Sequence, residues 1–402
     1  MSACDVLVVG GGPAGATASL ALARAGLTVA VVEKAAFPRR KVCGDFISAT
    51  TWPMLRELGV GESLSRRAGP GVRRVGLHVG EAIVDAPMPA PAERESWGRA
   101  VGRETLDTEL FAAAVRAGAS PWQPWAVRAC EDDGTSWRVA LEAPGGARAE
   151  VRARVIVAAH GSWEPGQALE TQSPRLPPGD ADLLGFKAHF RGARLAPETM
   201  PLVLFPGGYG GLVATDDGRT SFSCCVRRDA LQDMRAAHPG RSGAGEAVLA
   251  HAMATCRGLR ETLAGAERDG PWLGAGPIRP GLRTLVRRRL FAVGNAAGEA
   301  HPLVAEGLSM AMQSGWILAA QIVRARGLDD RALAAAGTQY TRAWRTQFAS
   351  RVRASQAFAT LALGTELQRA AAALFPRIPS LLTWGARHSG KAHALASLEA
   401  MP

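Results

Sequence analysis

The chain has 402 residues, of which 47% are hydrophobic, and a formal net charge of +11 at pH 7. This length is sufficient for a large buried core and for two domains. No run of about eighteen or more apolar residues occurs, so we expect no transmembrane helix. The start, MSACDVLVVGGG, lacks the basic stretch and the cleavage site of a secretory signal, which predicts a cytoplasmic protein.

The positive charge differs from that of a nucleic-acid-binding protein. Only four of the 47 basic residues are lysines, and the arginines are spread along the chain without a basic run interleaved with aromatic residues. We therefore expect no nucleic-acid partner and interpret the charge as a compositional preference for arginine; the alternative is that it attracts an anionic cofactor or an anionic membrane surface. The six cysteines include no C-x-x-C pair, which argues against a metal site and against a disulfide framework.

Hydrophobic patterning predicts an α/β protein with two kinds of sheet. The elements expected first are strand 4–10, helix 16–26, strand 27–34, helix 104–118, strands 122–129 and 136–142, and strand 152–161. From about residue 181 the pattern changes to alternating strands, 183–192, 200–208 and a hairpin over 209–228. A strand over 288–298 and a helix over 306–327 then return the chain to the first unit, and the last seventy residues are expected to be helical.

A glycine-rich turn lies between the first predicted strand and the first predicted helix. Gly10, Gly12 and Gly15 form G-x-G-x-x-G, in which the first glycine permits the turn and the second lets the backbone approach a pyrophosphate. The third glycine allows close packing of helix and strand, and the helix N-terminus favours negative charge. Glu33 ends the second strand, where a carboxylate accepts ribose hydroxyls. The motif predicts a Rossmann-type dinucleotide site but does not decide between FAD and a nicotinamide cofactor.

Four further segments decide in favour of FAD by resemblance. FPRRKVCGDFIS, GRETLD, VIVAAHG and FAVGNAAGEAHPLVAEGLSMAMQSG occur in the order found in FAD-dependent reductases and monooxygenases. The chain resembles the geranylgeranyl reductases and the aromatic hydroxylases of the p-hydroxybenzoate hydroxylase type over roughly residues 4–325, and it is similar to flavoproteins that accompany polyketide synthases. The resemblance implies a glutathione-reductase-like Rossmann-type FAD domain, an inserted antiparallel sheet domain that covers the substrate, and a helical C-terminal region. The expected boundaries are 1–75, 100–180 and 275–330 for the FAD domain, 76–99 and 181–274 for the sheet domain, and 331–402 for the C-terminal region.

The same resemblance implies the cofactor contacts. Arg40 or Lys41 would contact the pyrophosphate, Asn295 replaces the family's aspartate at the ribityl chain, and the helix opening at Gly307 would direct its amides at the flavin ring. His160 stands where the family has an aspartate. The residues expected to bind the cofactor are Gly10, Gly12, Ala14, Gly15, Glu33, Lys34, Arg40, Lys41, Arg103, Val127, Gly161, Gly294, Asn295, Pro302, Gly307, Leu308 and Ser309.

Five residues are candidates for catalysis. Cys43 lies in a loop that passes near the flavin in the resembling reductases, and His301 precedes a proline that lines the reacting face. Tyr209, Lys187 and His189 lie on strands expected to roof a substrate pocket, the last two on one face of their strand. Each of the five has an alternative role in packing or structure.

Two reactions fit this set of residues. The sequence favours a monooxygenase that hydroxylates an apolar aromatic or polyketide-type molecule, with NAD(P)H as the reductant. The alternative is a reductase that passes hydride to a double bond, and a non-catalytic electron carrier is a third interpretation. The apolar segment 357–384, with its single arginines, predicts an amphipathic surface helix that serves packing, dimerisation, or contact with a membrane and a lipophilic substrate.

Overall fold

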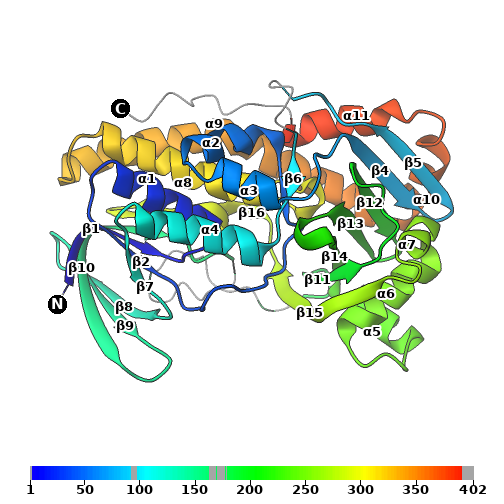
Figure 1. Ribbon diagram of the computed structural model, residues 1–402, viewed down its shortest axis with the longest axis horizontal. Coiled ribbons are helices and arrows are strands. Elements are labelled where there is room, and N and C mark those ends of the chain that lie inside the picture. Colours follow the sequence, from blue (N-terminus) through cyan, green and yellow to red (C-terminus); the bar gives the residue numbers. More distant parts are fainter. Residues whose placement is uncertain (1, 92–96, 163–168, 170–176, 178, 392–402) are drawn as a thin grey trace.

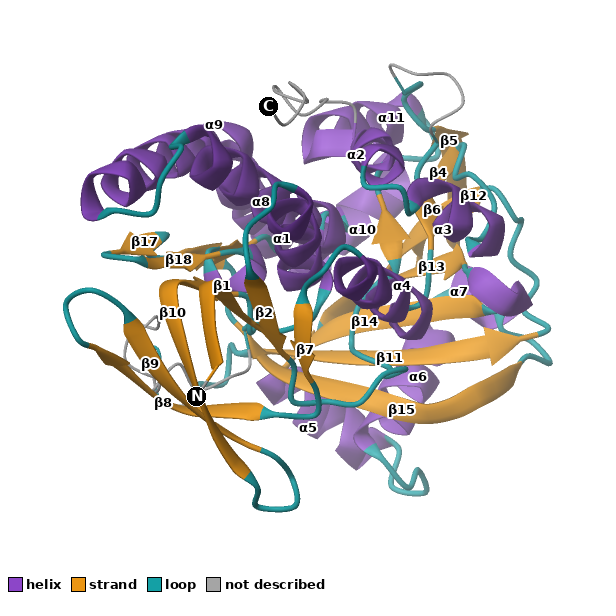
Figure 2. Cartoon of the chain, turned by 60° about the vertical axis from the view of Figure 1, so that its left-hand side comes forward, coloured by secondary structure: helices purple, strands orange, loops and turns teal. Residues whose placement is uncertain are grey.

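The computed structural model describes residues 2–91, 97–162, 169, 177 and 179–391. Its first sheet has the strand order β17-β18-β10-β1-β2-β7, and a hairpin of β8 and β9 joins it along β10 (Figures 1 and 2). The strands are β1 (Ser2–Val9), β2 (Val29–Val32), β7 (Ser120–Trp122), β8 (Ala126–Asp132), β9 (Trp137–Glu142), β10 (Arg148–Ala158), β17 (Val286–Arg287) and β18 (Leu290–Ala292). β18, β10, β1, β2 and β7 run parallel, while β9 and β17 pair antiparallel.

The first sheet is buried on both faces. Val6 and Val8 of β1 point into the core formed with helices α1 (Pro13–Arg24), α4 (Arg103–Arg116) and α8 (Gly307–Arg324). Leu7 and Val9 point to the opposite side, where they pack against the β8–β9 hairpin. Because successive side chains of a strand alternate between faces, a continuous apolar run is required for a strand covered on both sides. The motif at the end of β1 is thereby held rigidly against α1.

The second sheet has the order β15-β11-β14-β13-β12-β4-β5 and is antiparallel except where β12 pairs with β4. Its strands are β4 (Arg74–Val79), β5 (Ala82–Pro87), β11 (Leu183–Arg191), β12 (Thr199–Phe205), β13 (Gly208–Ala214), β14 (Thr220–Arg227) and β15 (Glu267–Ile278). Helices α5 (Arg228–Ala237), α6 (Ala244–Thr255) and α7 (Arg257–Thr262) cover one face of it. The opposite face carries Lys187, His189 and Tyr209.

Short elements connect the two sheets. They are β3 (Phe46–Ile47), β6 (Arg99–Ala100), β16 (Gly281–Leu282), β19 (Gly298–Glu299), α2 (Trp52–Glu57) and α3 (Gly61–Arg67). The α/β class expected from the sequence is confirmed: a parallel Rossmann-type sheet, a separate antiparallel sheet and a helical C-terminal region. The exact domain boundaries stay a prediction.

The C-terminal region consists of α9 (Asp330–Leu363), α10 (Thr365–Leu374) and α11 (Ser380–Ala386). The segment 357–384 is divided among these three helices, because the chain is extended at Gly364 and contains Pro376 and Pro379 between α10 and α11. α10 and α11 lie beside β4 and β5 at one end of the molecule (Figure 1). Within the described residues, no helix combines the length and the apolarity needed to cross a bilayer.

Candidate active site

In the glycine-rich turn between β1 and α1, two glycines have no room for a side chain and the third has free space beside it. A Cβ on Gly15 would lie 1.9 Å from the carbonyl oxygen of Gly10, and a Cβ on Gly10, whose φ is +111°, would lie 2.4 Å from the carbonyl oxygen of Ala159. At Gly12 the nearest atoms to such a Cβ are guanidinium nitrogens of Arg103 at 3.6 Å and of Arg39 at 3.9 Å. Gly12 therefore presents bare backbone toward a basic surface, which is what a close-approaching phosphate requires.

A buried basic cluster surrounds Gly12. The Arg103 guanidinium forms two bonds of 2.7 Å to the carboxylate of Asp107, and Arg39 lies 3.5 Å from the same carboxylate. Lys41 lies behind them, with its Nζ 3.9 Å from the position of a Cβ on Gly161. The pKa of Lys41 is lowered to about 8, mainly by burial and, to a smaller extent, by repulsion from Arg103 and Arg39. Such a site favours an anion, because a bound anion would relieve the repulsion between the cations.

The structure separates the two residues that the sequence offers for the pyrophosphate. Lys41 belongs to the basic cluster, whereas Arg40 lies 3.0 Å from Glu104 and 3.3 Å from Asp269 of β15. Arg39, which the sequence did not single out, lies beside Gly12 in its place. Three consecutive basic residues carry no signal that tells which of them faces the turn.

Glu33 is held at the end of β2 by backbone amides. Its two carboxylate oxygens accept bonds of 2.9 Å from the N–H groups of Gly11 and Ala35. The Trp125 amide donates to the Glu33 carbonyl at 2.9 Å, which brings Val127 of β8 to the same edge of the sheet. Lys34, the neighbour of Glu33, is exposed. The buried carboxylate is oriented as a ribose-binding acid requires.

The second glycine-rich turn packs directly on the first helix. A Cβ on Gly294, whose φ is +60°, would lie 2.9 Å from the Cβ of Ala14. The Gly294 amide donates to Ser314 of α8 at 2.7 Å. This contact joins the two turns that the resemblance assigns to opposite parts of one cofactor.

Asn295 is held by a buried carboxylate that the sequence did not reveal. Its Nδ2 donates to Oε1 of Glu299 at 3.0 Å and to Ser162 at 2.8 Å. Arg283 lies 3.2 Å from the other oxygen of Glu299. Burial raises the pKa of Glu299, and Arg283 and Ser162 oppose this rise. Because both hydrogens of its side-chain amide are used in these bonds, Asn295 presents its side-chain oxygen, Oδ1, as an acceptor.

The N-terminus of α8 borders an open region. Gly307 is exposed, and no atom lies within 4 Å of a Cβ placed on it; Pro302 is also exposed. Leu308 and Ser309 are buried, and the Ser309 hydroxyl accepts bonds from the amide and hydroxyl of Ser48 at 3.0 and 2.9 Å. The expected contribution of Ser309 to the cofactor is thus limited to its backbone. The cradle at Gly12, the basic cluster and the space above Gly307 fit FAD.

The catalytic candidates form two groups on the second sheet's inner face. In the first, the Tyr209 hydroxyl lies 2.9 Å from Nδ1 of His301, and the His301 amide donates to Ser355 of α9 at 3.0 Å. Tyr209 and His301 are 2% and 4% exposed. Burial lowers the pKa of His301 to about 4 and raises that of Tyr209 well above its usual value. The imidazole is therefore neutral at pH 7, and its Nδ1 accepts a hydrogen bond from the tyrosine hydroxyl.

The second group is centred on Asp45, which follows Cys43 and Gly44 in the loop before β3. Lys187 and His189 reach the two oxygens of Asp45 at 2.6 and 2.9 Å. A Cβ on Gly44 would lie 3.4 Å from the Ser223 hydroxyl of β14, so this loop lies against the second sheet. Cys43 is half-buried at the start of the turn. Asp45 was missed because an aspartate after Cys-Gly gives no sequence signal for partners more than 140 positions away.

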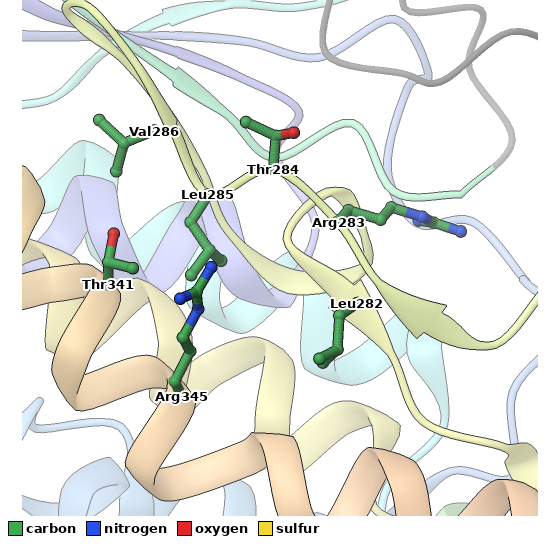
Figure 3. A pocket seen from close by; sticks show the side chains of 7 residues that line it. All are labelled: Leu282, Arg283, Thr284, Leu285, Val286, Thr341 and Arg345. Carbon is green, nitrogen blue, oxygen red and sulfur yellow. The ribbon is translucent and has the colours of Figure 1, made fainter.

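A separate pocket of about 340 Å³ lies between segment 282–286 and α9 (Figure 3). The Arg345 side chain points toward Leu285, while that of Arg283 extends away from it (Figure 3). The pocket is lined by Leu282, Arg283, Thr284, Leu285, Val286, Thr341 and Arg345. It includes none of the residues predicted from the sequence. In the described residues, no cluster of three or more His, Cys, Asp or Glu side chains is arranged to hold a metal ion.

Known proteins resemble this chain in sequence and in fold. Residues 3–173 match the FAD binding domain family. A digeranylgeranylglycerophospholipid reductase of Methanopyrus kandleri is 28% identical over 359 residues, which cover 86% of each chain. A menaquinone reductase of Mycobacterium tuberculosis is 36% identical over 165 residues, 40% of this chain and only 38% of that protein. The structure of a myxobacterial chondrochloren halogenase superposes with a TM-score of 0.77 at 20% identity, covering 95% of this chain and 91% of the other.

The fold and the glycine-rich site are those of an FAD-binding domain of the Rossmann type. The match to the FAD binding domain family covers residues 3–173 and agrees with the motifs found there. The resemblance to the geranylgeranyl reductases is confirmed. At 20% identity, the likeness to the halogenase shows a shared fold and nothing more.

Proposed function

We propose that the protein is an FAD-dependent reductase that saturates a carbon–carbon double bond of a lipophilic, isoprenoid-type molecule. The observation that carries this proposal is the buried contact of 2.9 Å between Tyr209 and His301, on the apolar inner face of the second sheet. The names of the two sequence relatives describe reductases, and both names refer to lipophilic substrates. We propose NAD(P)H as the source of electrons.

The surroundings of Tyr209 suit a lipophilic substrate. Tyr209 belongs to an apolar cluster that extends over β4, β12 and β14 and reaches Leu303, directly after Pro302. The cluster includes Leu77, Val79, Leu204, Cys225, Leu303 and Phe375. An apolar site with a few convergent polar groups is typical of small-molecule binding. A hydrocarbon chain would bind there by burial of apolar surface, and polar recognition would be confined to its ends.

Saturation of a double bond requires hydride at one carbon and a proton at the other. Bound reduced FAD supplies the hydride. Tyr209 holds a proton at its Oη, and neutral His301 fixes the direction of this O–H group through Nδ1. In the transfer step this O–H group turns from Nδ1 to the second carbon, so that the O–H bond breaks as the new C–H bond forms, and the phenolate left on Tyr209 takes up a proton to restore the enzyme. The Cys43 thiol is the alternative donor, since its loop lies against the same sheet.

Hydroxylation, which the sequence alone favours, is the less well supported reaction. A relative that matches 86% of this chain is named a reductase, whereas the resemblance to the halogenase is confined to the fold. The two reactions also differ in their need for oxygen. A hydroxylated product contains one atom of molecular oxygen, and a reduced product contains two additional hydrogens.

Anaerobic turnover tests the proposal. The FAD-loaded enzyme, NAD(P)H or dithionite, and a polyprenyl lipid should give a product heavier by two hydrogens per bond. Product formation that requires oxygen and incorporates labelled oxygen would overturn the proposal. Tyr209→Phe should lower the turnover number by about a hundredfold with unchanged flavin content. If Cys43→Ser shows this loss and Tyr209→Phe does not, the thiol is the donor.

The chain offers a matched control in its other tyrosine. Tyr340 is also buried, and its hydroxyl donates at 2.6 Å to the carbonyl of Ala292 in β18 of the first sheet. Tyr340→Phe removes one buried hydroxyl just as Tyr209→Phe does. It should cost about 1 kcal/mol of stability and leave the turnover number unchanged.

A further inference from the structure

The C-terminal helices expose an unusual set of apolar side chains. Leu367, Leu374, Ile378 and Trp384 have exposed fractions of 45%, 44%, 44% and 54%. In the described part of the chain, the other large apolar side chains that are exposed are Ile83 and Leu282. Isolated exposed leucines are normal on a protein surface, but four within eighteen positions form a patch.

Helix α10 has two apolar stripes, of which the fold uses one. Ala371, Ala372 and Phe375 pack on the second sheet, and Gln368 on the same side donates to the Phe205 carbonyl at 3.0 Å. A second stripe, formed by Leu367, Ala370 and Leu374, is exposed. A surface helix of a globular protein normally turns its remaining faces to water with polar residues. The second stripe therefore requires an apolar partner outside the described chain.

The charges along these helices indicate which partner. Glu366 is the only acidic residue between positions 365 and 391, and it is paired with Arg369 at 2.6 Å. Arg377 and Arg387 are exposed beside the apolar side chains, without an acid in the segment to balance them. Trp384 stacks on His388 with 4.4 Å between the ring centroids. Exposed Leu and Ile with Trp and flanking Arg is the composition of a helix that lies in a membrane interface.

We propose that the α10–α11 surface, formed by Leu367, Leu374, Ile378, Trp384, Arg377 and Arg387, docks on an anionic lipid bilayer. The apolar side chains enter the boundary between headgroups and acyl chains, and the arginines remain among the anionic headgroups. α10 and α11 lie at one end of the molecule (Figure 1), and the four apolar side chains of this surface are exposed. The overall charge of +11 acts in the same direction.

The docked surface is adjacent to the active site. Ala371, Phe375 and Leu382, on the inner sides of the same two helices, belong to the apolar cluster that contains Tyr209 and Leu303. A lipophilic molecule could thus pass from the bilayer to Tyr209 along apolar side chains. This second step rests on the proposed function, whereas membrane docking itself does not.

Vesicle co-sedimentation tests the docking directly. The full-length, FAD-loaded protein should pellet with vesicles of phosphatidylcholine and phosphatidylglycerol, and much less with phosphatidylcholine alone. The triple variant Leu374→Ser, Ile378→Ser, Trp384→Ser should bind the anionic vesicles about tenfold more weakly or worse. Leu282→Ser, which removes a similarly exposed leucine outside the surface, is the matched control and should bind like the parent. Arg377→Gln with Arg387→Gln should reduce the preference for anionic vesicles.

The outcomes separate the two proposals. Absence of vesicle binding at low salt, or equal binding by the triple variant, overturns the docking whatever the enzyme catalyses. If the parent is a dimer that the triple variant dissociates, and neither binds vesicles, the surface is a self-association interface and the docking is wrong. Vesicle binding without substrate reduction would overturn only the proposed function. Melting temperature and flavin content confirm that each variant is folded.

Discussion

The ammonium group of Lys187 lies 2.6 Å from Oδ1 of Asp45, and this contact joins the second sheet to the loop that carries Cys43. Asp45 is 0% exposed and Lys187 is 1% exposed, so neither charge is solvated by bulk water. His189 completes the group at 2.9 Å from the other carboxylate oxygen. Removing one member leaves a buried charge without its partner, which is far more costly than removing a surface ion pair.

Lys187→Met should therefore lower the free energy of unfolding by about 3 kcal/mol, measured by urea denaturation. The control is Arg66→Met, which removes an exposed ion pair to Glu62 with the same 2.6 Å distance. That variant should lose less than about 1 kcal/mol. Equal losses in the two variants would show that burial does not strengthen the Lys187 contact.

The pH dependence of this contact follows from the pKa of Asp45. Burial alone would raise it, but Lys187 and His189 together lower it from 3.8 to about 2. A carboxylate with a lowered pKa contributes stability above its unfolded pKa, and this contribution is lost as the pH falls toward the folded value. The stability difference between the parent and Asp45→Asn should be constant above about pH 5 and shrink between about pH 4 and 2.

The first glycine-rich turn illustrates what could be predicted from the sequence. Gly10, Gly12 and Glu33 are separated by at most 23 positions, and a strand followed by a helix places them together for local reasons. Asp45 and Lys187 are 142 positions apart, and Asn295 and Ser162 are 133 apart. Such contacts depend on how the two sheets and the second turn are placed relative to one another. The hydrophobic periodicity of the sequence does not determine that placement. It also does not tell which of Arg39 and Arg40 lies beside Gly12.

The two kinds of glycine in the first turn should respond differently to substitution. Gly12→Val should leave the apoprotein folded, because a Cβ at this position meets only guanidinium ends at 3.6 and 3.9 Å. It should nevertheless abolish FAD binding, since the side chain fills the place of the pyrophosphate. Gly15→Val, whose Cβ would lie 1.9 Å from the carbonyl oxygen of Gly10, should prevent stable folding. Circular dichroism of the apoprotein and flavin absorbance distinguish these results; normal flavin content in Gly12→Val would refute the cofactor position.

Binding of FAD should be linked to proton uptake by Lys41. Its pKa is lowered to about 8 by burial and by the cations Arg103 and Arg39. An anionic pyrophosphate at Gly12 raises that pKa again, so the affinity for FAD should be full below pH 8 and fall as the pH rises beyond it. Titration of the apoprotein by flavin fluorescence between about pH 6 and 10 measures the effect, with a limit of about tenfold per pH unit. Lys41→Arg keeps the charge and should remove the pH dependence; if the dependence persists in this variant, Lys41 is not its source.

The last prediction concerns Asn295, which occupies the place of an aspartate in the resembling families. The sequence alone predicts that Asn295→Asp still binds FAD with a loss of at most about 2 kcal/mol. The structure shows a reason for a larger effect, because the Nδ2 of Asn295 donates to Glu299 at 3.0 Å. An aspartate would place a second carboxylate against Glu299, in a site where burial already raises the pKa of that residue.

Asn295→Asp should therefore lose FAD at pH 8 and recover it toward pH 5, where one proton shared by the two carboxyl groups restores the hydrogen bond. The double variant Asn295→Asp, Glu299→Gln restores a donor opposite the new carboxylate, so it should bind FAD at both pH values. Glu299→Gln alone has one acceptor oxygen for two donors, Asn295 Nδ2 and the Arg283 guanidinium, so it should bind FAD more weakly than the double variant. Flavin retained after gel filtration at the two pH values measures all three variants. Full retention by Asn295→Asp at pH 8 would show that Glu299 does not select the asparagine.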